Sequence, residues 1–298
     1  MSQADTKAGF VSVVGRPNSG KSSLLNWLIG EKLALVSHKA NATRKRMNFI
    51  LMHKNAQIIF IDTPGIHQKE RVLNKFMLEE ALKAIGDCDL ILFLASVKDS
   101  IEEYEKFLEL NKKNTPHIVL LTKMDLISKE ALLKKISQYH RYQENYKELI
   151  PVSIKRGTKQ NELLDIIIKY IPNHPYLYDP ELLTTENLKE IYKEYIREAL
   201  FDNLSDEIPY LSDVIVKKVE ELPDMEKIYA NIITEKKSQK GMIIGKEGSA
   251  IKRIGIQARK NIEELCRKKV FLKLEVVVKP GWSKDKKALA DLGYRVET

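Results

Sequence analysis

The sequence contains few cysteines and no long hydrophobic run. Its 298 residues include only Cys88 and Cys266, which stand far apart without C-x-x-C spacing. This argues against a disulfide framework or a thiolate metal site and predicts two small buried apolar side chains. The longest apolar run, residues 90–95, is far short of the about 20 residues that span a membrane, and the polar residues 1–9 offer no signal region. We therefore expect a soluble cytoplasmic protein.

Acidic residues are scarce in one C-terminal region. Residues 236–287 contain 16 Lys/Arg and 5 Asp/Glu and carry +11, whereas the whole chain carries +9 and the remainder therefore −2. A basic field of this strength favours a polyanionic partner. Before any motif is considered, the alternative is a solvated lysine-rich face.

A phosphate-binding motif stands near the N-terminus. Residues 15–22 read GRPNSGKS, which fits G-x-x-x-x-G-K-[ST]. The motif follows an apolar run predicted to be a buried strand and precedes a helical pattern, so its backbone N–H groups should converge on one concavity that holds phosphate. Lys21 would reach the β- and γ-phosphates, and the Ser22 hydroxyl would ligate Mg²⁺. The other nucleotide-binding residues predicted here are Gly15, Asn18, Ser19, Gly20 and Ser23.

Two later segments are placed to sense the γ-phosphate. Thr43 is the best candidate for a switch threonine that meets Mg²⁺ and the γ-phosphate, although spacing alone does not distinguish it from Ser37 and the other nearby hydroxyls. Residues 62–65 read DTPG directly after a predicted strand. Asp62 could hold the metal through water, and Gly65 lets a backbone N–H approach the phosphate closely. The predicted catalytic residues are Lys21, Thr43, Asp62 and Gly65, and the predicted metal ligands are Ser22, Thr43 and Asp62.

A third pair of segments would select the base. Asp125, in the TKMD run at residues 122–125, could accept hydrogen bonds from two N–H groups on one edge of guanine that adenine does not present. Lys123 would pack along the base. Backbone N–H groups near residues 153–155 could meet the guanine carbonyl oxygen. The predicted base-binding residues are Thr122, Lys123, Asp125, Ser153, Ile154 and Lys155.

Short apolar runs alternate with longer amphipathic stretches through this half of the chain. The alternation predicts an α/β fold with a mostly parallel sheet covered on both faces, with ligands at the carboxyl ends of the strands. The motifs in this order resemble the GTPase domain of the Ras-like superfamily, and Asn18 with Thr43-Arg44 is similar to its bacterial ribosome-assembly branch, the TrmE-Era-EngA-like GTPases. The resemblance implies GTP and GDP as ligands, and K⁺ beside Asn18.

Three positions depart from the pattern of these GTPases. Thr122 replaces the usual Asn, which is expected to loosen a contact to the base and lower affinity. Ile154 replaces an Ala but retains the backbone donor. Ile66 stands where Ras proteins carry the Gln that orients the attacking water, and His67 is a weak candidate to replace it, so intrinsic hydrolysis should be slow.

The C-terminal part of the chain centres on the loop GKEG at residues 245–248. Two glycines would let a phosphodiester backbone run against the loop, and the following helix N-terminus adds N–H dipoles. The flanking pattern is α-β-β-α-α-β, and with the loop it resembles a KH domain of the prokaryotic type, type II, which implies binding of about four nucleotides of single-stranded RNA. The predicted RNA-binding residues are Ile244, Gly245, Lys246, Glu247, Gly248, Ile251, Lys252, Arg253, Ile254, Arg259 and Trp282.

The roles expected of these residues differ. Ile244, Ile251 and Ile254 would wall an apolar groove under the bases, whereas Lys252, Arg253 and Arg259 would hold phosphates. Trp282 would either add a stacking surface or cap the end of the last strand.

The length predicts about two domains. We expect a GTPase domain over residues 1–172, a proline-rich linker over 173–184 and a KH domain over 185–298. The whole chain resembles the Era family of bacterial GTPases. That resemblance implies a slow GTP-hydrolysing switch that binds the 3′ end of small-subunit ribosomal RNA and assists assembly of the 30S subunit. It also implies loose association with the inner membrane, and no obligate protein partner is evident.

Two other functions remain compatible with the sequence. In the first, the protein binds RNA, and the nucleotide is a structural ligand whose turnover is incidental. In the second, the protein is a signalling GTPase whose basic face meets an acidic membrane surface. The G-x-x-G context argues against this alternative, because binding to a membrane surface does not require it.

Overall fold

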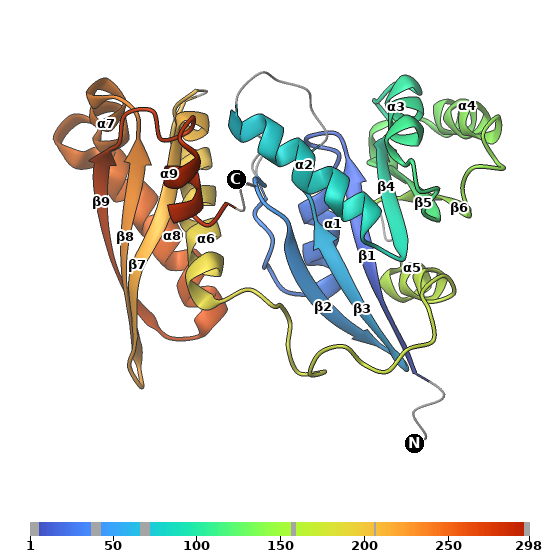
Figure 1. Cartoon of the computed structure of the whole chain (residues 1–298), viewed down its shortest axis with the longest axis horizontal. Coiled ribbons are helices and arrows are strands. Elements are labelled where there is room, and N and C mark those ends of the chain that lie inside the picture. Colours follow the sequence, from blue (N-terminus) through green and yellow to red (C-terminus); the bar gives the residue numbers. More distant parts are fainter. Residues whose placement is uncertain (1–5, 37–42, 66–71, 156–158, 206, 295–298) are drawn as a thin grey trace. The chain divides into compact units, whose positions relative to one another are not determined.

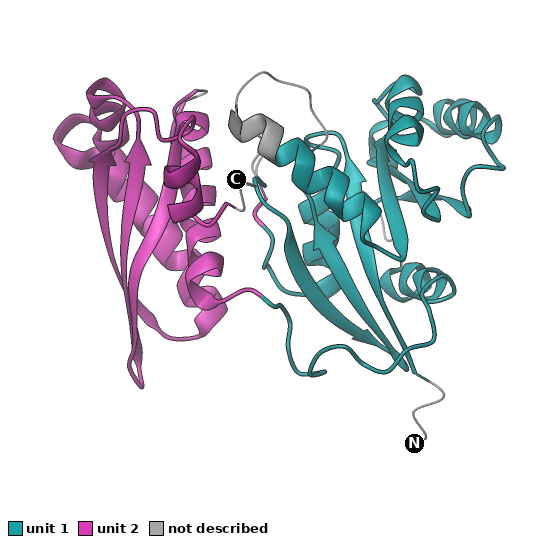
Figure 2. Cartoon of the chain, in the orientation of Figure 1, with its two compact units in different colours: residues 1–34, 43–68, 77–185 teal, residues 35–42, 69–76, 186–298 magenta. Residues whose placement is uncertain are grey.

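The computed structural model describes residues 6–36, 43–65, 72–155, 159–205 and 207–294, with only the backbone described for 72–76. The chain divides into two compact units (Figure 2). Unit 1 comprises Met1–Ala34, Thr43–Gln68 and Met77–Thr185, and unit 2 comprises Leu35–Ala42, Lys69–Phe76 and Glu186–Thr298.

Unit 1 is built on a six-stranded sheet in the order β2-β3-β1-β4-β5-β6 (Figure 1). All neighbouring strands are parallel except β2 and β3. Every residue of β3, β4 and β5 is buried, which is the pattern of strands covered on both faces. The predicted α/β fold with a mostly parallel sheet is confirmed. The strands are β1 (Lys7–Gly15), β2 (Met47–His53), β3 (Ala56–Asp62), β4 (Leu90–Ser96), β5 (His117–Thr122) and β6 (Glu148–Val152).

The helices of unit 1 connect these strands. They are α1 (Lys21–Ile29), α2 (Val72–Gly86), α3 (Glu102–Leu110), α4 (Lys129–His140) and α5 (Gln160–Ile167), and the 3₁₀ helix η2 (Met124–Leu126) follows β5. The phosphate motif connects β1 to α1, and the TKMD run connects β5 to η2. Since β1 and β5 run in the same direction as β4 between them, both motifs lie at the carboxyl edge of the sheet, where ligands collect in such folds.

The proline-rich segment predicted as a linker is bound to unit 1. The buried side chain of Gln57 accepts hydrogen bonds from the backbone N–H groups of Leu177 and Tyr178 at 2.8 and 3.0 Å, and it donates to the Tyr178 carbonyl at 2.8 Å. Thr184 donates through its hydroxyl to the carbonyl of Asn48 at 2.6 Å. The segment therefore has specific partners although it forms no helix.

Unit 2 has a three-stranded sheet in the order β7-β8-β9, in which β7 is antiparallel and β9 parallel to β8. Ile228 and Ile232 of β8 pack with Ile254 and Ile262 of α8 in a core that covers one face of the sheet. The predicted α-β-β-α-α-β order is confirmed, and a short helix, α9, follows it. The elements are α6 (Leu188–Asn203), η3 (Ile208–Leu211), β7 (Ser212–Glu221), β8 (Met225–Thr234), α7 (Lys237–Ile244), η4 (Lys246–Gly248), α8 (Ser249–Cys266), β9 (Lys269–Val278) and α9 (Lys286–Asp291).

The two cysteines are partly buried, whereas the sequence predicted buried side chains. Cys88 and Cys266 are both free thiols that pack at the margins of hydrophobic cores. Burial raises the pKa of the Cys88 thiol to about 12, so it stays protonated and unreactive at neutral pH. Among the described helices, none is long and apolar enough to cross a membrane.

Candidate nucleotide and nucleic-acid sites

The phosphate motif adopts backbone conformations that favour glycine. Gly15 has a φ of 156°, and a Cβ atom there would lie 2.5 Å from the carbonyl oxygen of Leu94. Gly20 has a φ of 103° and caps the N-terminus of α1, and Asn18 has a φ of 63°. Asparagine is one of the few other residues that tolerate such a conformation. The loop therefore turns sharply from β1 into α1, which presents the first N–H groups of the helix to the concavity.

Lys21 lies in the centre of this loop. Its side chain is buried, and its ammonium donates to the carbonyl oxygens of Gly15 and Arg16 at 3.1 and 3.0 Å. Burial lowers the pKa of Lys21 to about 8, an effect that the carboxylates of Asp62 and Asp99 partly oppose. A bound phosphate chain would favour the charged amine far more strongly.

This pKa leads to a prediction for nucleotide binding. Because the free site has a Lys21 pKa of about 8 and phosphates raise it, binding should take up most of a proton at pH 8.5 and almost none at pH 7. Affinity should accordingly fall as pH rises above 8. Titration calorimetry in two buffers of different ionisation enthalpy measures this uptake directly. Equal uptake at both pH values would contradict the assignment of Lys21 to the phosphates.

Three oxygen atoms converge beside the lysine, and they belong to the three residues that the sequence proposes as metal ligands. The Ser22 hydroxyl lies 3.1 Å from Oδ2 of Asp62 and 3.4 Å from the Thr43 hydroxyl, which itself lies 3.3 Å from Oδ2 of Asp62. Two hydroxyls and a carboxylate are the hard oxygen donors that Mg²⁺ prefers, so the residues present fit this ion. The structure thus brings Thr43 to the site, whereas Ser37 lies outside the described residues.

The DTPG segment lies directly against the phosphate motif. A Cβ atom at Gly65 would lie 2.8 Å from the backbone nitrogen of Pro17, so glycine is required for this approach. The hydroxyl of Thr63 donates to the carbonyl of Val13 in β1 at 2.7 Å and anchors the segment. The sequence predictions for Ile66 and His67 fall on residues outside the described part of the chain.

The base-binding segments also meet at this edge. Asp125 accepts a hydrogen bond from the Ser153 hydroxyl at 2.7 Å, which links the two segments predicted to hold guanine. Lys123 donates to the carbonyl of Asn18 at 2.6 Å. The Thr122 hydroxyl donates to the carbonyl of Ser19 at 2.8 Å, so this residue connects β5 to the phosphate loop. Ile154 and Lys155 are exposed beside them.

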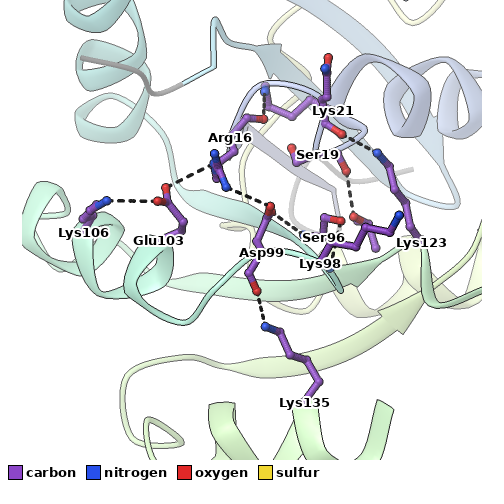
Figure 3. A network of polar contacts seen from close by, with 12 residues as sticks. Arg16, Ser19, Lys21, Ser96, Lys98, Asp99, Glu103, Lys106, Lys123 and Lys135 are labelled. Carbon is purple, nitrogen blue, oxygen red and sulfur yellow. Dashed lines mark hydrogen bonds and ion pairs between the residues drawn. The ribbon is translucent and has the colours of Figure 1, made fainter. Parts of the chain in front are cut away.

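Sequence reasoning missed one acidic residue that organises the rim of the site. Asp99 lies 3.5 Å from Arg16 of the phosphate motif, accepts from the N–H of Ser96 at 3.0 Å, and its backbone carbonyl accepts from Lys135 of α4 (Figure 3). Arg16 also lies 3.7 Å from Glu103. The only signal in the sequence was a Ser-x-x-Asp turn after the apolar run of β4.

The GKEG loop of unit 2 has the strained backbone expected of its glycines. Gly245 and Gly248 have φ values of 75° and 76°, and Glu247 between them has a φ of 51°. A Cβ atom at Gly245 would lie 2.8 Å from the backbone nitrogen of Ala250, whereas one at Gly248 would meet open space. Lys246 and Glu247 are exposed on the loop.

The residues around this loop differ in their access to a ligand. Lys252, Arg253 and Arg259 are exposed, and Ile244 and Ile251 are partly buried against the core. Ile254 is fully buried, because every fourth residue of α8 from Ala250 faces the sheet, so its prediction as a groove wall is wrong.

The prediction of a stacking role for Trp282 is also wrong. Its side chain is 1% exposed, and its backbone N–H donates to the Lys279 carbonyl in the turn after β9. This geometry matches the alternative of a tryptophan that covers the end of the last strand.

Known proteins match both halves of the chain. Residues 10–123 match the family described as 50S ribosome-binding GTPase, and residues 207–283 match the KH domain family. GTPase Era of Campylobacter concisus is 54% identical over 289 residues, covering 97% of this chain and 100% of that protein. GTPase Era of Helicobacter pylori is 50% identical over 294 residues and covers 97% of each chain.

Solved structures agree with these relatives. A variant of Aquifex aeolicus Era bound to GDP and AlF₄⁻ has a TM-score of 0.92 and 32% identity, covering 98% of this chain and 100% of that one. Era in complex with MgGDPNP and nucleotides 1506–1542 of 16S ribosomal RNA also has a TM-score of 0.92, with 33% identity and the same coverage. With relatives at least half identical over nearly their full length, the chain belongs to the Era family of GTPases.

Proposed function

We propose that this GTPase is a slow switch that binds the 3′ end of small-subunit ribosomal RNA and assists assembly of the 30S subunit. The observation that carries the proposal is the position of Thr43 beside Ser22 and Asp62, next to Lys21. The hydroxyl oxygens of Thr43 and Ser22 and Oδ2 of Asp62 lie within 3.4 Å of one another. A threonine from a connecting segment at this point reports whether a γ-phosphate is present. We assign the GTPase domain to residues 1–172, the connection to 173–184 and the RNA-binding domain to 185–298.

Hydrolysis would proceed by direct attack of water on the γ-phosphate. Lys21 would donate to the β- and γ-phosphate oxygens, and the backbone N–H of Gly65 would approach the γ-phosphate. Ser22, Thr43 and Asp62 would hold Mg²⁺, which supplies charge neutralisation when bound. Asp125 would fix guanine, with Ser153 orienting its carboxylate. We also propose K⁺ beside Asn18, whose exposed side chain offers an amide oxygen.

The RNA would bind at the GKEG loop in the GTP-bound form and leave after hydrolysis. Exposed Lys246 and the N–H groups at the start of α8 would contact phosphates, and the partly buried Ile244 and Ile251 would lie beneath bases. A relative of this family has been solved with nucleotides 1506–1542 of 16S ribosomal RNA, which supports this RNA end as the ligand. We further propose that the protein works in the cytoplasm, in loose contact with the inner membrane.

The proposal predicts a nucleotide-dependent RNA affinity. We expect a single-stranded RNA that ends in the small-subunit rRNA 3′ sequence to bind roughly 5- to 150-fold more tightly with a non-hydrolysable GTP analogue than with GDP, the usual range of coupling between two sites. Fluorescence anisotropy at fixed salt measures both affinities. Equal affinities would break the coupling and leave an RNA-binding protein with a structural nucleotide.

A loop variant tests where the RNA binds. Lys246→Glu should weaken RNA binding in both nucleotide states, because it reverses a charge that is exposed beside the phosphates. Substitution of Gly245 is less informative, since any side chain there would clash with Ala250. The matched control is Lys112→Glu, which makes the same charge change at an exposed position of unit 1. If both variants weaken RNA binding equally, the contact is general electrostatic attraction, and the loop is not the site.

A further inference from the structure

The sheet of unit 2 has a second face that the core helices do not cover. In β8 the even-numbered residues from Glu226 to Ile232 are buried, whereas the odd-numbered ones are only partly buried. Side chains alternate across a strand, so Lys227 and Tyr229 lie on the opposite face from the core. The parallel register places Phe271 beside Lys227 and Lys273 beside Tyr229 on that face.

An open depression extends from this face, at the amino ends of β8 and the edge strand β9, to the last turns of α8. Its volume is about 960 Å³, and it is bounded by the first residues of β8 and β9 and the last turns of α8. Its described lining contains five cationic side chains and one carboxylate. The lining residues are Met225, Lys227, Tyr229, Arg259, Glu263, Arg267, Lys268, Lys269, Val270 and Phe271.

Two aromatic rings stand among these cations. Phe271 is 47% exposed and is the one exposed phenylalanine among the described side chains. Its ring centroid lies 6.1 Å from that of Tyr229, with an angle of 60° between the rings. Exposed aromatic faces within a basic surface are the features on which single-stranded nucleic acids stack, because each base offers a π-face and each phosphate a negative charge.

The charges of the depression are directed mainly to solvent. Glu263 accepts a hydrogen bond from the N–H of Val270 at 3.1 Å, which fixes the start of β9, and it lies 3.9 Å from Arg259. Arg267 and Lys269 are exposed, and no described ion pair involves either of them. The depression therefore keeps a strong excess of positive charge that an anionic chain can complement.

The depression is separate from the GKEG loop. That loop precedes the first residue of α8, whereas Arg259 and Arg267 lie about 15 and 27 Å further along the helix axis at 1.5 Å per residue. The loop follows α7, which comes after the carboxyl end of β8, whereas the strand residues that line the depression belong to the amino ends of β8 and β9. Figure 1 shows these two ends of β8 and β9. A KH loop clamps only about four nucleotides, so an RNA that also reaches Arg267 at the far end of α8 has to be longer than that.

We propose that this depression is a second binding site for single-stranded RNA, in which bases stack on Phe271 and Tyr229 and phosphates meet Arg267, Lys268 and Lys269. The inference rests on the proposed function, since it extends the RNA contact of the same unit. It accounts for how a chain of this family can hold an RNA much longer than four nucleotides, as the relative solved with nucleotides 1506–1542 does. An acidic peptide would satisfy the cations but would leave the aromatic faces without a partner.

The experiment compares two RNAs on the full-length protein with the GTP analogue. One RNA has about five nucleotides, enough for the GKEG loop alone, and the other has about 15 nucleotides of the same rRNA 3′ sequence. We expect Phe271→Ala to weaken binding of the long RNA by roughly 5- to 100-fold and to leave the short RNA unchanged, in line with the loss of stacking for one base. Phe271→Trp should restore the affinity, because it retains a stacking surface.

Control variants separate this site from folding and from the loop. Leu133→Ala removes an exposed hydrophobic side chain from unit 1, 64% exposed against 47% for Phe271, and should change neither affinity. Lys269→Ala should change the salt dependence of binding for the long RNA alone. The slope of the logarithm of the binding constant against the logarithm of the salt concentration should become less steep by roughly 0.7. Lys246→Glu should weaken both RNAs.

Several results would overturn the proposal. An unchanged affinity of Phe271→Ala for the long RNA would do so, as would an equal loss for both RNAs, which would assign Phe271 to the loop site. An acidic peptide is also tested as a competitor of the long RNA for the wild-type protein. If it lowers the affinity for the long RNA to that for the short RNA, the depression is assigned to a protein partner. If the wild-type protein binds neither RNA, the proposed function fails together with the second site. If it binds the short RNA and this binding depends on Lys246, the proposed function stands whatever the long RNA shows.

Discussion

Lys21→Ala should abolish GTP hydrolysis, with a loss of about 10³-fold or more in kcat/KM, because one buried transition-state donor alone is worth about 10²–10³. The ammonium lies in the centre of the phosphate loop and is buried, and a water molecule that fills the space left by alanine would not supply its positive charge. Truncating one partner of a buried charge pair also weakens ground-state binding by about 2–5 kcal/mol, so nucleotide affinity should fall as well.

Phosphate release under single-turnover conditions measures the chemical step, and a fluorescent GTP analogue measures binding. The control is Lys112→Ala, which removes an exposed lysine from the segment before β5, at the opposite edge of the sheet from the site. The overall fold should survive in both variants, as circular dichroism would show. Hydrolysis by Lys21→Ala within tenfold of wild type would remove this residue from the catalytic machinery.

Asp125→Asn should change the base that the protein accepts. In the proposed site the carboxylate accepts two hydrogen bonds from guanine, and hydrogen bonds to a charged group are worth about 1.5–3 kcal/mol each, so GTP affinity should fall by roughly 10²- to 10⁴-fold. Xanthine carries a carbonyl oxygen where guanine has its amino group, and an asparagine side chain can donate to it. The hydroxyl of Ser153, now 2.7 Å from Oδ1 of Asp125, can still donate to the retained oxygen and hold the amide in place.

Competition between GTP and XTP for a fluorescent nucleotide tests this exchange. Asp125→Ala is the matched control, since it removes the acceptor without supplying a donor and should lose GTP without gaining XTP. If Asp125→Asn keeps full GTP affinity, or binds XTP no better than the alanine variant does, the carboxylate does not read the base.

Much of the fold and the site was predictable because each motif is a short continuous segment whose conformation its own residues impose. Gly15 and Gly20 take backbone angles that suit glycine, and the strand before them and helix after them follow from local apolar patterns. The same holds for Gly245 and Gly248 in unit 2. The order of strands at the carboxyl edge then brings the separate motifs together, as parallel sheets do.

The predictions that failed concern side chains whose surroundings come from distant parts of the chain. For Trp282 the sequence left stacking on RNA and capping of the last strand both open, and the burial of its side chain in the turn after β9 excludes the stacking role. Ile254 belongs to the buried stripe of α8, and helical spacing alone does not say which of two apolar stripes faces the sheet. For Asp99 the sequence contained only a common Ser-x-x-Asp turn, because its role depends on Arg16 and Lys135, which lie 83 and 36 residues away.

The order of residues was therefore sufficient for the phosphate loop, the base-binding segment and the G-x-x-G turn, since local backbone angles and hydrogen-bonding groups within a few residues produce them. The fold was needed to show that the Thr122 hydroxyl bonds to the phosphate loop at Ser19, and that Phe271 and Tyr229 share an uncovered sheet face. Ser19 and Thr122 are 103 positions apart in the sequence, and Tyr229 and Phe271 are 42 positions apart. Strand register and packing bring these pairs together, and no local pattern encodes them.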